Sequence, residues 1–319
     1  MDREELKQYI QGTPATIPTA FDNRFNLDNI KMKEMTEWWV ASGLGTNTAA
    51  LKVLAAMGEG PDINDDEWPK VLDTVVKAAG SDKIVLCALK SKNTLHTIED
   101  AKKAQDLGAL GLQIELPYNH HSNQDDLVRH FSEISDAIDI GIMIYNTWWF
   151  CMDRVNHSIQ ADTMMRLKDT NGVVAIKWSV PEGEDYDEMT KFSSDFNVID
   201  NSGYDFRARC FKNGGSGYIS DIVVVNPSHD IHLLDLYKKG FYDQAKQYSD
   251  AVISVIRPWQ IKAATKSGGY RQGKGLLEAI GRSMGPPRPP TLPCTKAVSY
   301  THLRAHETEA DLVCRLLLE

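Results

Sequence analysis

The sequence predicts an α/β fold, a (β/α)8 TIM barrel with additional C-terminal helices. Short β-rich runs alternate with longer stretches whose apolar residues recur at helical spacing, and counting one less regular segment there are eight strands. This alternation predicts parallel strands joined by right-handed crossovers, and eight such units close into a barrel. The alternative is an open doubly wound sheet, but no GxGxxG turn follows the first strand.

The expected elements follow one another in regular order. The strands are short apolar runs at residues 15–21, within 43–58, and at 83–89, 111–116, 141–146, 173–179, 197–200 and 217–220. Helices are expected between them at residues 27–41, 65–79, 94–107, 124–138 and 161–169. Asp28, Asp65 and Thr94 occupy the expected N-cap positions, because their side chains can accept hydrogen bonds from the first turn.

Three segments are expected along the chain. Residues 1–225 form the barrel, and residues 226–296 form a helical extension with helices at 229–239, 242–256 and 259–266. Residues 297–319 share no periodicity with the rest and resemble translated read-through of a sequencing adapter, so we expect a non-native tail. Cys314, His302 and His306 therefore carry no functional weight.

Composition excludes several function classes. The 319 residues include 44 acidic and 35 basic side chains, which give a net charge of −9 and disfavour nucleic-acid or anionic-membrane binding. No apolar stretch reaches the roughly 18 residues of a membrane helix, and the acidic N-terminus does not resemble a secretory signal, so a cytoplasmic protein is expected. The five cysteines are scattered without CxxC spacing and are interpreted as reduced thiols.

Two side chains at strand ends are candidates for chemistry. The catalytic residues of a (β/α)8 barrel project from the C-terminal ends of its strands. Lys177 ends an apolar run, where desolvation lowers the pKa of an amine and makes it nucleophilic. Tyr145 ends the preceding run, where its hydroxyl can relay protons. The alternatives are a lysine that reaches the surface and a tyrosine that only packs.

Several motifs together resemble one known family. They are IMIYN at 142–146, VVAIKWS at 173–179, the strand-loop IELPYNHHSNQDDLVRHF at 114–131, Gly58-Glu59, and GGSGYIS at 214–220. Over about residues 13–293 the chain resembles the dihydrodipicolinate synthase and N-acetylneuraminate lyase family, class I aldolases that handle pyruvate. The resemblance implies that Lys177 forms a Schiff base with a 2-oxo acid and that Tyr145 shuttles protons.

The resemblance also implies a substrate site and an assembly. Met57, Gly58 and Glu59 would shape the carboxylate end of the site, and Gly203, Ile219 and Ser220 would line another side. It implies a homotetramer of two tight dimers, or a homodimer, and needs no cofactor or metal. Backbone N–H groups around Met57 and Gly58 can bind a carboxylate whatever the side chains are.

Two departures from the family pattern concern the substrate. Ala56 and Met57 stand where the family has two threonines that bind the pyruvate carboxylate. Synthases that take aspartate semialdehyde have an arginine after the tyrosine, whereas this chain has Trp148 and Trp149, with Arg154 the nearest arginine. Together with Phe150 and Trp178, these rings predict an apolar or aromatic-faced pocket, in which Trp148 contacts the substrate, or else a packed rim or subunit contact.

A further departure lies in the loop after the fourth strand. Tyr118 matches the first of two family tyrosines, while Asn119 replaces the second, so His120 or His121 can take over proton transfer. A metal site is not indicated, because adjacent loop histidines without a carboxylate rarely ligate together.

The sequence therefore predicts a Schiff-base-forming lyase (aldolase) that acts on pyruvate or another 2-oxo acid and is not the lysine-biosynthetic synthase itself. The alternatives are a 2-keto-3-deoxy sugar acid dehydratase of the same family and a non-catalytic barrel that binds a keto acid. A phosphate-binding barrel that uses the glycines at 214–217 has positional support only.

Overall fold

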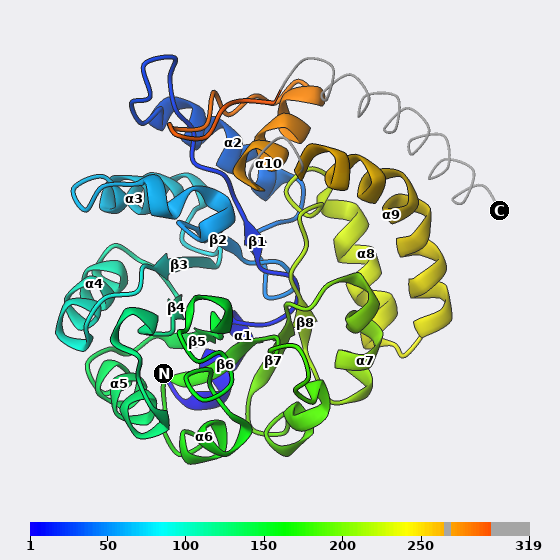
Figure 1. The fold of residues 1–319 in the computed structure, drawn as a ribbon. Coiled ribbons are helices and arrows are strands. Elements are labelled where there is room, and N and C mark those ends of the chain that lie inside the picture. The colour runs from blue at the N-terminus through cyan, green and yellow to red at the C-terminus, as the bar shows by residue number, and fades with distance from the viewer. Residues whose placement is uncertain (265–268, 295–319) are drawn as a thin grey trace.

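Eight parallel strands curl into a barrel that is surrounded by helices (Figure 1). The computed structural model describes residues 1–264 and 269–294. The strands pair in sequence order from first to last: β1 (Ala15–Thr16), β2 (Leu51–Val53), β3 (Val85–Leu89), β4 (Gly111–Glu115), β5 (Gly141–Tyr145), β6 (Val173–Trp178), β7 (Asn197–Asp200) and β8 (Gly217–Tyr218). The predicted (β/α)8 barrel is confirmed.

The barrel closes through the backbone just before β1. Gly12 forms a parallel bridge with Gly217, and the Tyr218 N–H donates to the Gly12 carbonyl at 3.0 Å. A Cβ at Gly217 would lie 1.8 Å from the Gly12 oxygen, so only glycine permits this approach. Regular strand pairing in β1 covers only Ala15 and Thr16, which is shorter than the predicted strand at 15–21.

The outer helices follow the predicted alternation. They are α2 (Asn29–Ala41), α3 (Trp68–Ala79), α4 (Thr94–Asp106), α5 (Gln124–Asp136), α6 (Ala161–Arg166) and α7 (Arg207–Lys212), and a 3-10 helix (Tyr186–Lys191) joins β6 to β7. Asp28 caps α2 as predicted, since its side chain accepts from the Lys31 N–H. The other two cap predictions were wrong: Glu67 and Asn93 stand at the N-caps of α3 and α4, and only the Asn93 side chain accepts a hydrogen bond there.

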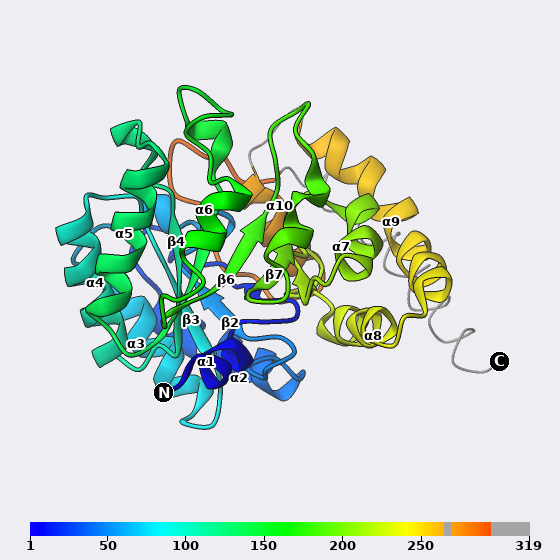
Figure 2. The same ribbon diagram turned by 90° about the horizontal axis from the view of Figure 1, so that it is seen from below.

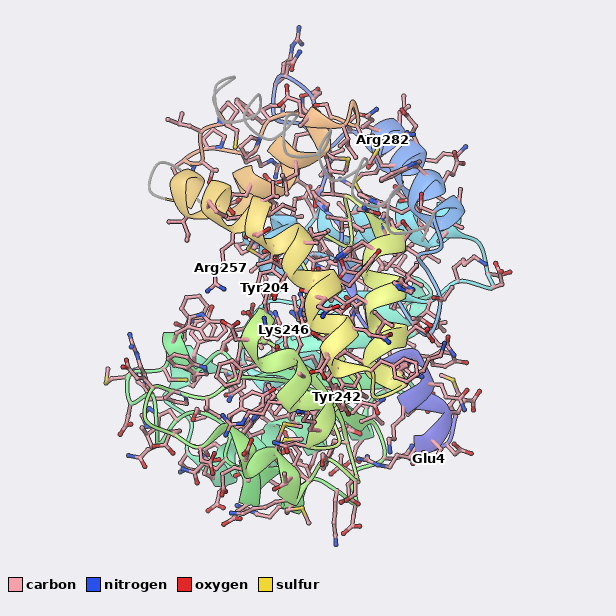
Figure 3. The ribbon with its side chains drawn as sticks, turned by 90° about the vertical axis from the view of Figure 1, so that its right-hand side faces the viewer. Glu4, Tyr204, Tyr242, Lys246, Arg257 and Arg282 are labelled. Atoms are coloured by element: carbon pink, nitrogen blue, oxygen red, sulfur yellow. The ribbon has the colours of Figure 1, made fainter. Side chains whose placement is uncertain are left out.

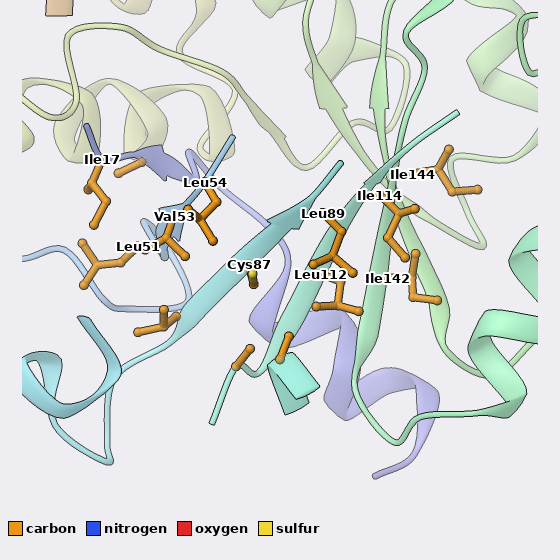
Figure 4. Packing of buried hydrophobic residues seen from close by; sticks show 14 of the residues in the cluster. Ile17, Leu51, Val53, Leu54, Cys87, Leu89, Leu112, Ile114, Ile142 and Ile144 are labelled. Atoms are coloured by element: carbon orange, nitrogen blue, oxygen red, sulfur yellow. The ribbon is translucent and has the colours of Figure 1, made fainter. Parts of the chain in front are cut away.

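Apolar residues fill the space between the sheet and the helices. Alternate side chains of the strands point outward into this layer, as Figure 4 shows for Leu51 and Val53 of β2 and for Ile142 and Ile144 of β5. Cys87 of β3 belongs to the same cluster and is fully buried, so it is a small core residue. Burial raises the pKa of its thiol, which disfavours a reactive thiolate.

Helix α1 (Arg3–Tyr9) covers one end of the barrel (Figure 2). Leu6 and Ile10 are buried against apolar residues of the barrel interior. A Cβ at Gly111 or Gly141 would lie 2.8 or 3.0 Å from the Ile10 Cδ1 atom, so both glycines leave room for this side chain. The N-terminal ends of the strands are thereby closed, and the opposite end is left for a site.

Three C-terminal helices lie along one side of the barrel: α8 (Pro227–Lys238), α9 (Tyr242–Ala264) and α10 (Gly269–Ala279). Arg257 of α9 pairs with Asp205 at 3.6 Å, next to Tyr204 (Figure 3). The predicted division into helices at 242–256 and 259–266 was wrong, because α9 continues through Pro258. The tail expected at 297–319 lies outside the described residues.

Candidate active site

Lys177 and Tyr145 meet at the C-terminal ends of neighbouring strands. They are register partners between β6 and β5. The Lys177 Nζ atom lies 3.6 Å from the centroid of the Tyr145 ring. The two residues are only 7% and 8% exposed, so the amine is held among protein groups and not in bulk solvent.

Burial dominates the electrostatics of this pair. Desolvation lowers the pKa of Lys177 from 10.5 to about 7, although Glu115 and Asp221 partly oppose the shift. Burial, with Glu115 next, raises the pKa of Tyr145, while a hydrogen bond from Asn201 acts the other way. Burial therefore favours the neutral amine of Lys177 and the protonated phenol of Tyr145.

A cavity opens directly onto this pair, and it encloses about 640 Å³ when its open mouth is counted. Its walls come from the ends of β1, β5, β6 and β8, from the 3-10 turn after β2 (Ala56–Gly58), and from α9 and α10. The lining is mixed apolar and polar and comprises Thr16, Pro18, Ala55, Ala56, Met57, Tyr145, Lys177, Ile219, Ser220, Asp221, Val224, Gln260, Gln272, Gly273 and Leu276.

Three of the six residues expected to bind substrate by resemblance reach this cavity. Met57, Ile219 and Ser220 line it. Gly58 packs on the backbone after β1, where a Cβ would lie 2.6 Å from the Ile17 oxygen. The fully buried Glu59 is not in the lining, because its carboxylate pairs with the Lys274 ammonium at 2.6 Å. Gly203 lies outside as well, in the loop that the Asp200 carboxylate holds after β7.

The aromatic residues after β5 and β6 separate into two groups. Trp148 lines a second cavity beside the first, and its indole N–H donates to the Ser179 Oγ atom at 3.1 Å. Trp149 lies between Trp148 and Tyr145, with ring centroids 5.4 and 5.6 Å away. Trp178 points into the core and packs on Phe192, so the expectation that it faces the pocket was wrong. Alternation along β6 explains this, because neighbours of Lys177 face the opposite side of the sheet.

His120 and His121 do not line the cavity that opens onto Lys177 and Tyr145. His120 ends the short 3-10 turn Tyr118–His120, and the His121 ring lies 5.9 Å from His157. Tyr118 packs on Phe150, with ring centroids 4.9 Å apart. Among residues 1–264 and 269–294, no cluster of three or more His, Cys, Asp or Glu side chains is placed to hold a metal ion.

Sequence reasoning missed the contribution of the C-terminal helices. Helix α10 contacts the 3-10 turn after β2, and Gln272, Gly273 and Leu276 of this helix line the cavity. Lys274 faces inward, where it pairs with Glu59 and donates to the Pro286 carbonyl at 3.1 Å. The glycines in this segment hide the helical pattern, so the sequence gives only a weak signal for α10.

Comparisons with known proteins agree with this architecture. The model of the Dihydrodipicolinate synthetase family matches residues 10–306. The chain is 29% identical over 285 residues to the 4-hydroxy-tetrahydrodipicolinate synthase of Rhodopseudomonas palustris (strain BisA53), which covers 89% of this chain and 91% of the relative. It is 26% identical over 274 residues to the enzyme of that name from Staphylococcus carnosus (strain TM300), covering 83% and 89%.

Solved structures share the fold at lower identity. The dihydrodipicolinate synthase from Oceanobacillus iheyensis superposes with a TM-score of 0.81 at 18% identity and covers 97% of this chain and 100% of that one. A protein described as the first monomeric dihydrodipicolinate synthase variant superposes with a TM-score of 0.80 at 24% identity, covering 95% and 98%. Since the family model matches nearly the whole chain, the protein belongs to the dihydrodipicolinate synthetase family.

Proposed function

We propose that the protein is a Schiff-base-forming lyase that acts on pyruvate or another 2-oxo acid. The observation that supports this most is the buried Lys177 amine, 3.6 Å from the Tyr145 ring centroid at the floor of an open cavity. An amine with a pKa of about 7 attacks a ketone at neutral pH, which a lysine of ordinary pKa does poorly. Family membership supports a lyase in general.

The chemistry proceeds through a covalent imine. The Lys177 nitrogen adds to C2 of the 2-oxo acid, and the carbinolamine loses its hydroxyl as water once Tyr145 has supplied a proton. The protonated imine then accepts the electron pair of the C3–C4 or the C3–H bond, which leaves an enamine, and the proton released from the C4 hydroxyl or from C3 goes to the Tyr145 phenolate. After C–C cleavage the phenol returns this proton to C3, and hydrolysis of the resulting imine releases the product and restores the amine. Every step uses groups already present in the cavity and water.

The substrate differs in this proposal from that of the lysine-biosynthetic synthase. No arginine lies between Tyr145 and Cys151, where those synthases have one that pairs with a second substrate carboxylate. The nearest arginine, Arg154, lies 5.9 Å from the Trp148 ring. Thr16 and Ser220, together with Tyr145, supply the hydroxyl groups of the cavity lining. The curated relatives carry the name of the synthase, so this difference needs a direct test.

Borohydride trapping tests the proposed function. Reduction in the presence of pyruvate should leave a stable adduct on Lys177, located by peptide mass spectrometry, and Lys177→Arg should lose it. Lys52 is a matched control, because it is fully buried, donates to the Gln113 Oε1 atom at 3.0 Å and does not line the cavity. Lys52→Met should keep the adduct. A folded protein without an adduct on Lys177 would contradict the proposal, and analysis of products separates C–C cleavage from dehydration.

An oligomer is also part of the proposal. Phe150, which packs on the Tyr118 ring, is 55% exposed, and Met152 is 76% exposed. Such exposed apolar side chains are typical of a subunit contact. We expect a homodimer or homotetramer in light scattering at micromolar concentration. The helices within the described segments lack the length and apolar character needed to cross a membrane.

A further inference from the structure

A second cavity lies beside the catalytic pair and, with its open mouth counted as for the first, encloses about 960 Å³. Its inner wall is formed by Trp148, Trp149, Ser179, Asn201, Ser202 and Phe206, which come from the segments that follow β5, β6 and β7. In a barrel of this type, these segments surround the reacting groups. The proposed imine chemistry does not use this space.

The wall of the second cavity adjoins the catalytic phenol through Trp149. The Trp149 ring meets the Tyr145 ring at 5.6 Å with an interplanar angle of 68°, and Asn201 hydrogen-bonds Tyr145 from the neighbouring segment. Ser179 lies just past the end of β6 and follows Lys177 by two residues. Trp149, Asn201 and Ser179 therefore connect the catalytic pair to the wall of the second cavity.

The side chains that line the second cavity indicate which kind of substrate tail it would bind. Trp148 and Trp149 pack edge to face with centroids 5.4 Å apart and are only half-buried, which leaves ring surface available to a ligand. Three exposed carboxylates, those of Glu182, Glu184 and Asp185, stand at the rim.

The guanidinium of Arg209, which also lines this cavity, is already paired with carboxylates. Arg209 donates to the Asp187 Oδ1 atom at 2.6 Å and lies 3.5 Å from Asp185. An anionic tail would therefore meet acidic side chains and a neutralised arginine, whereas a flat uncharged ring would meet aromatic surface.

We propose that this second cavity is a subsite for the uncharged aromatic tail of a 2-oxo acid whose ketone reacts at Lys177. The inference rests on the proposed function, because only the imine fixes the keto end of the substrate. It defines the substrate class as keto acids whose tail carries a planar apolar group.

Calorimetric titration of the full chain tests the subsite with three probes. 2-Oxo-4-phenylbutanoate should bind at least about tenfold more tightly than 2-oxobutanoate, which lacks the ring. 2-Oxoglutarate, whose tail is a carboxylate, should bind no more tightly than 2-oxobutanoate. Trp148→Ala and Phe206→Ala should each reduce the preference for the phenyl compound toward unity. Trp38→Phe, which changes a half-buried tryptophan on α2, should keep the preference.

The outcomes separate the two proposals. Equal affinity for the phenyl and plain compounds, or a preference that survives both cavity variants, would overturn the subsite even if pyruvate is trapped on Lys177. Tighter binding of 2-oxoglutarate would overturn the assignment of an uncharged tail. A phenyl preference that both variants abolish, in a protein that traps no pyruvate, would show that the cavity binds aromatic rings but would overturn the proposal that the ketone reacts at Lys177.

Discussion

Replacing Lys177 by methionine should stabilise the protein at neutral pH while it abolishes imine formation. Burial lowers the pKa of this amine from 10.5 to about 7. Each tenfold change in a proton equilibrium corresponds to about 1.4 kcal/mol, so the folded state bears a cost of up to roughly 5 kcal/mol. Methionine has a similar length and no charge, so the variant should unfold with a free energy that is roughly 2 to 5 kcal/mol higher at pH 7.

The cost of the buried amine to the stability of the folded state depends on pH. Below about pH 7 both the folded and the unfolded lysine keep the proton, and the whole cost is present. Between about pH 7 and 10.5 the folded amine has lost its proton while the unfolded one has not, so the cost declines, and it vanishes above 10.5. The stability gap between variant and wild type should therefore shrink steadily as pH rises from 7 to 10.

Urea unfolding of both proteins across that pH range measures the gap. Groups that titrate in both proteins cancel in the difference. Lys33→Met is a suitable control, since Lys33 is 65% exposed on α2 and should give a small gap that does not change with pH. A constant gap for Lys177→Met, or a variant less stable than wild type at pH 7, would refute the claim that the amine is desolvated.

Four further outcomes are expected. Lys274→Met leaves the Glu59 carboxylate buried without its partner and should lower the free energy of unfolding by about 3 to 5 kcal/mol. Adding Glu59→Gln to this variant should recover part of the lost stability. If the effects of the two substitutions are simply additive, the two side chains are not directly coupled. The initial rate of pyruvate trapping should rise with pH through a midpoint near 7, and a rate still rising tenfold per pH unit above 8.5 would contradict the lowered pKa. Tyr145→Phe should slow imine formation by about 10²- to 10⁴-fold in stopped-flow assays, and an unchanged rate would remove its role in proton transfer. Ile10→Ala should cost about 2 to 5 kcal/mol in urea unfolding, because it empties the closed end of the barrel, and a loss below 1 kcal/mol would show that the end is loosely packed.

The sequence alone determined the barrel and its two central side chains. Periodicities of two and of about 3.6 residues are local properties, so the alternation of strands and helices is visible without any tertiary contact. Lys177 and Tyr145 each follow an apolar run, and parallel strands bring their C-terminal ends to one edge, so their meeting could be predicted from residue order.

The tertiary structure decided what surrounds that pair. Helix α10 supplies part of the cavity wall, and the pair of Lys274 with Glu59 joins segments far apart in the chain, for which no local pattern codes. The structure also divided the tryptophans, turning Trp178 into the core and Trp149 toward Tyr145. Composition shows how many aromatic rings a chain has, but the side of the strand and the loop geometry decide which of them meet a substrate.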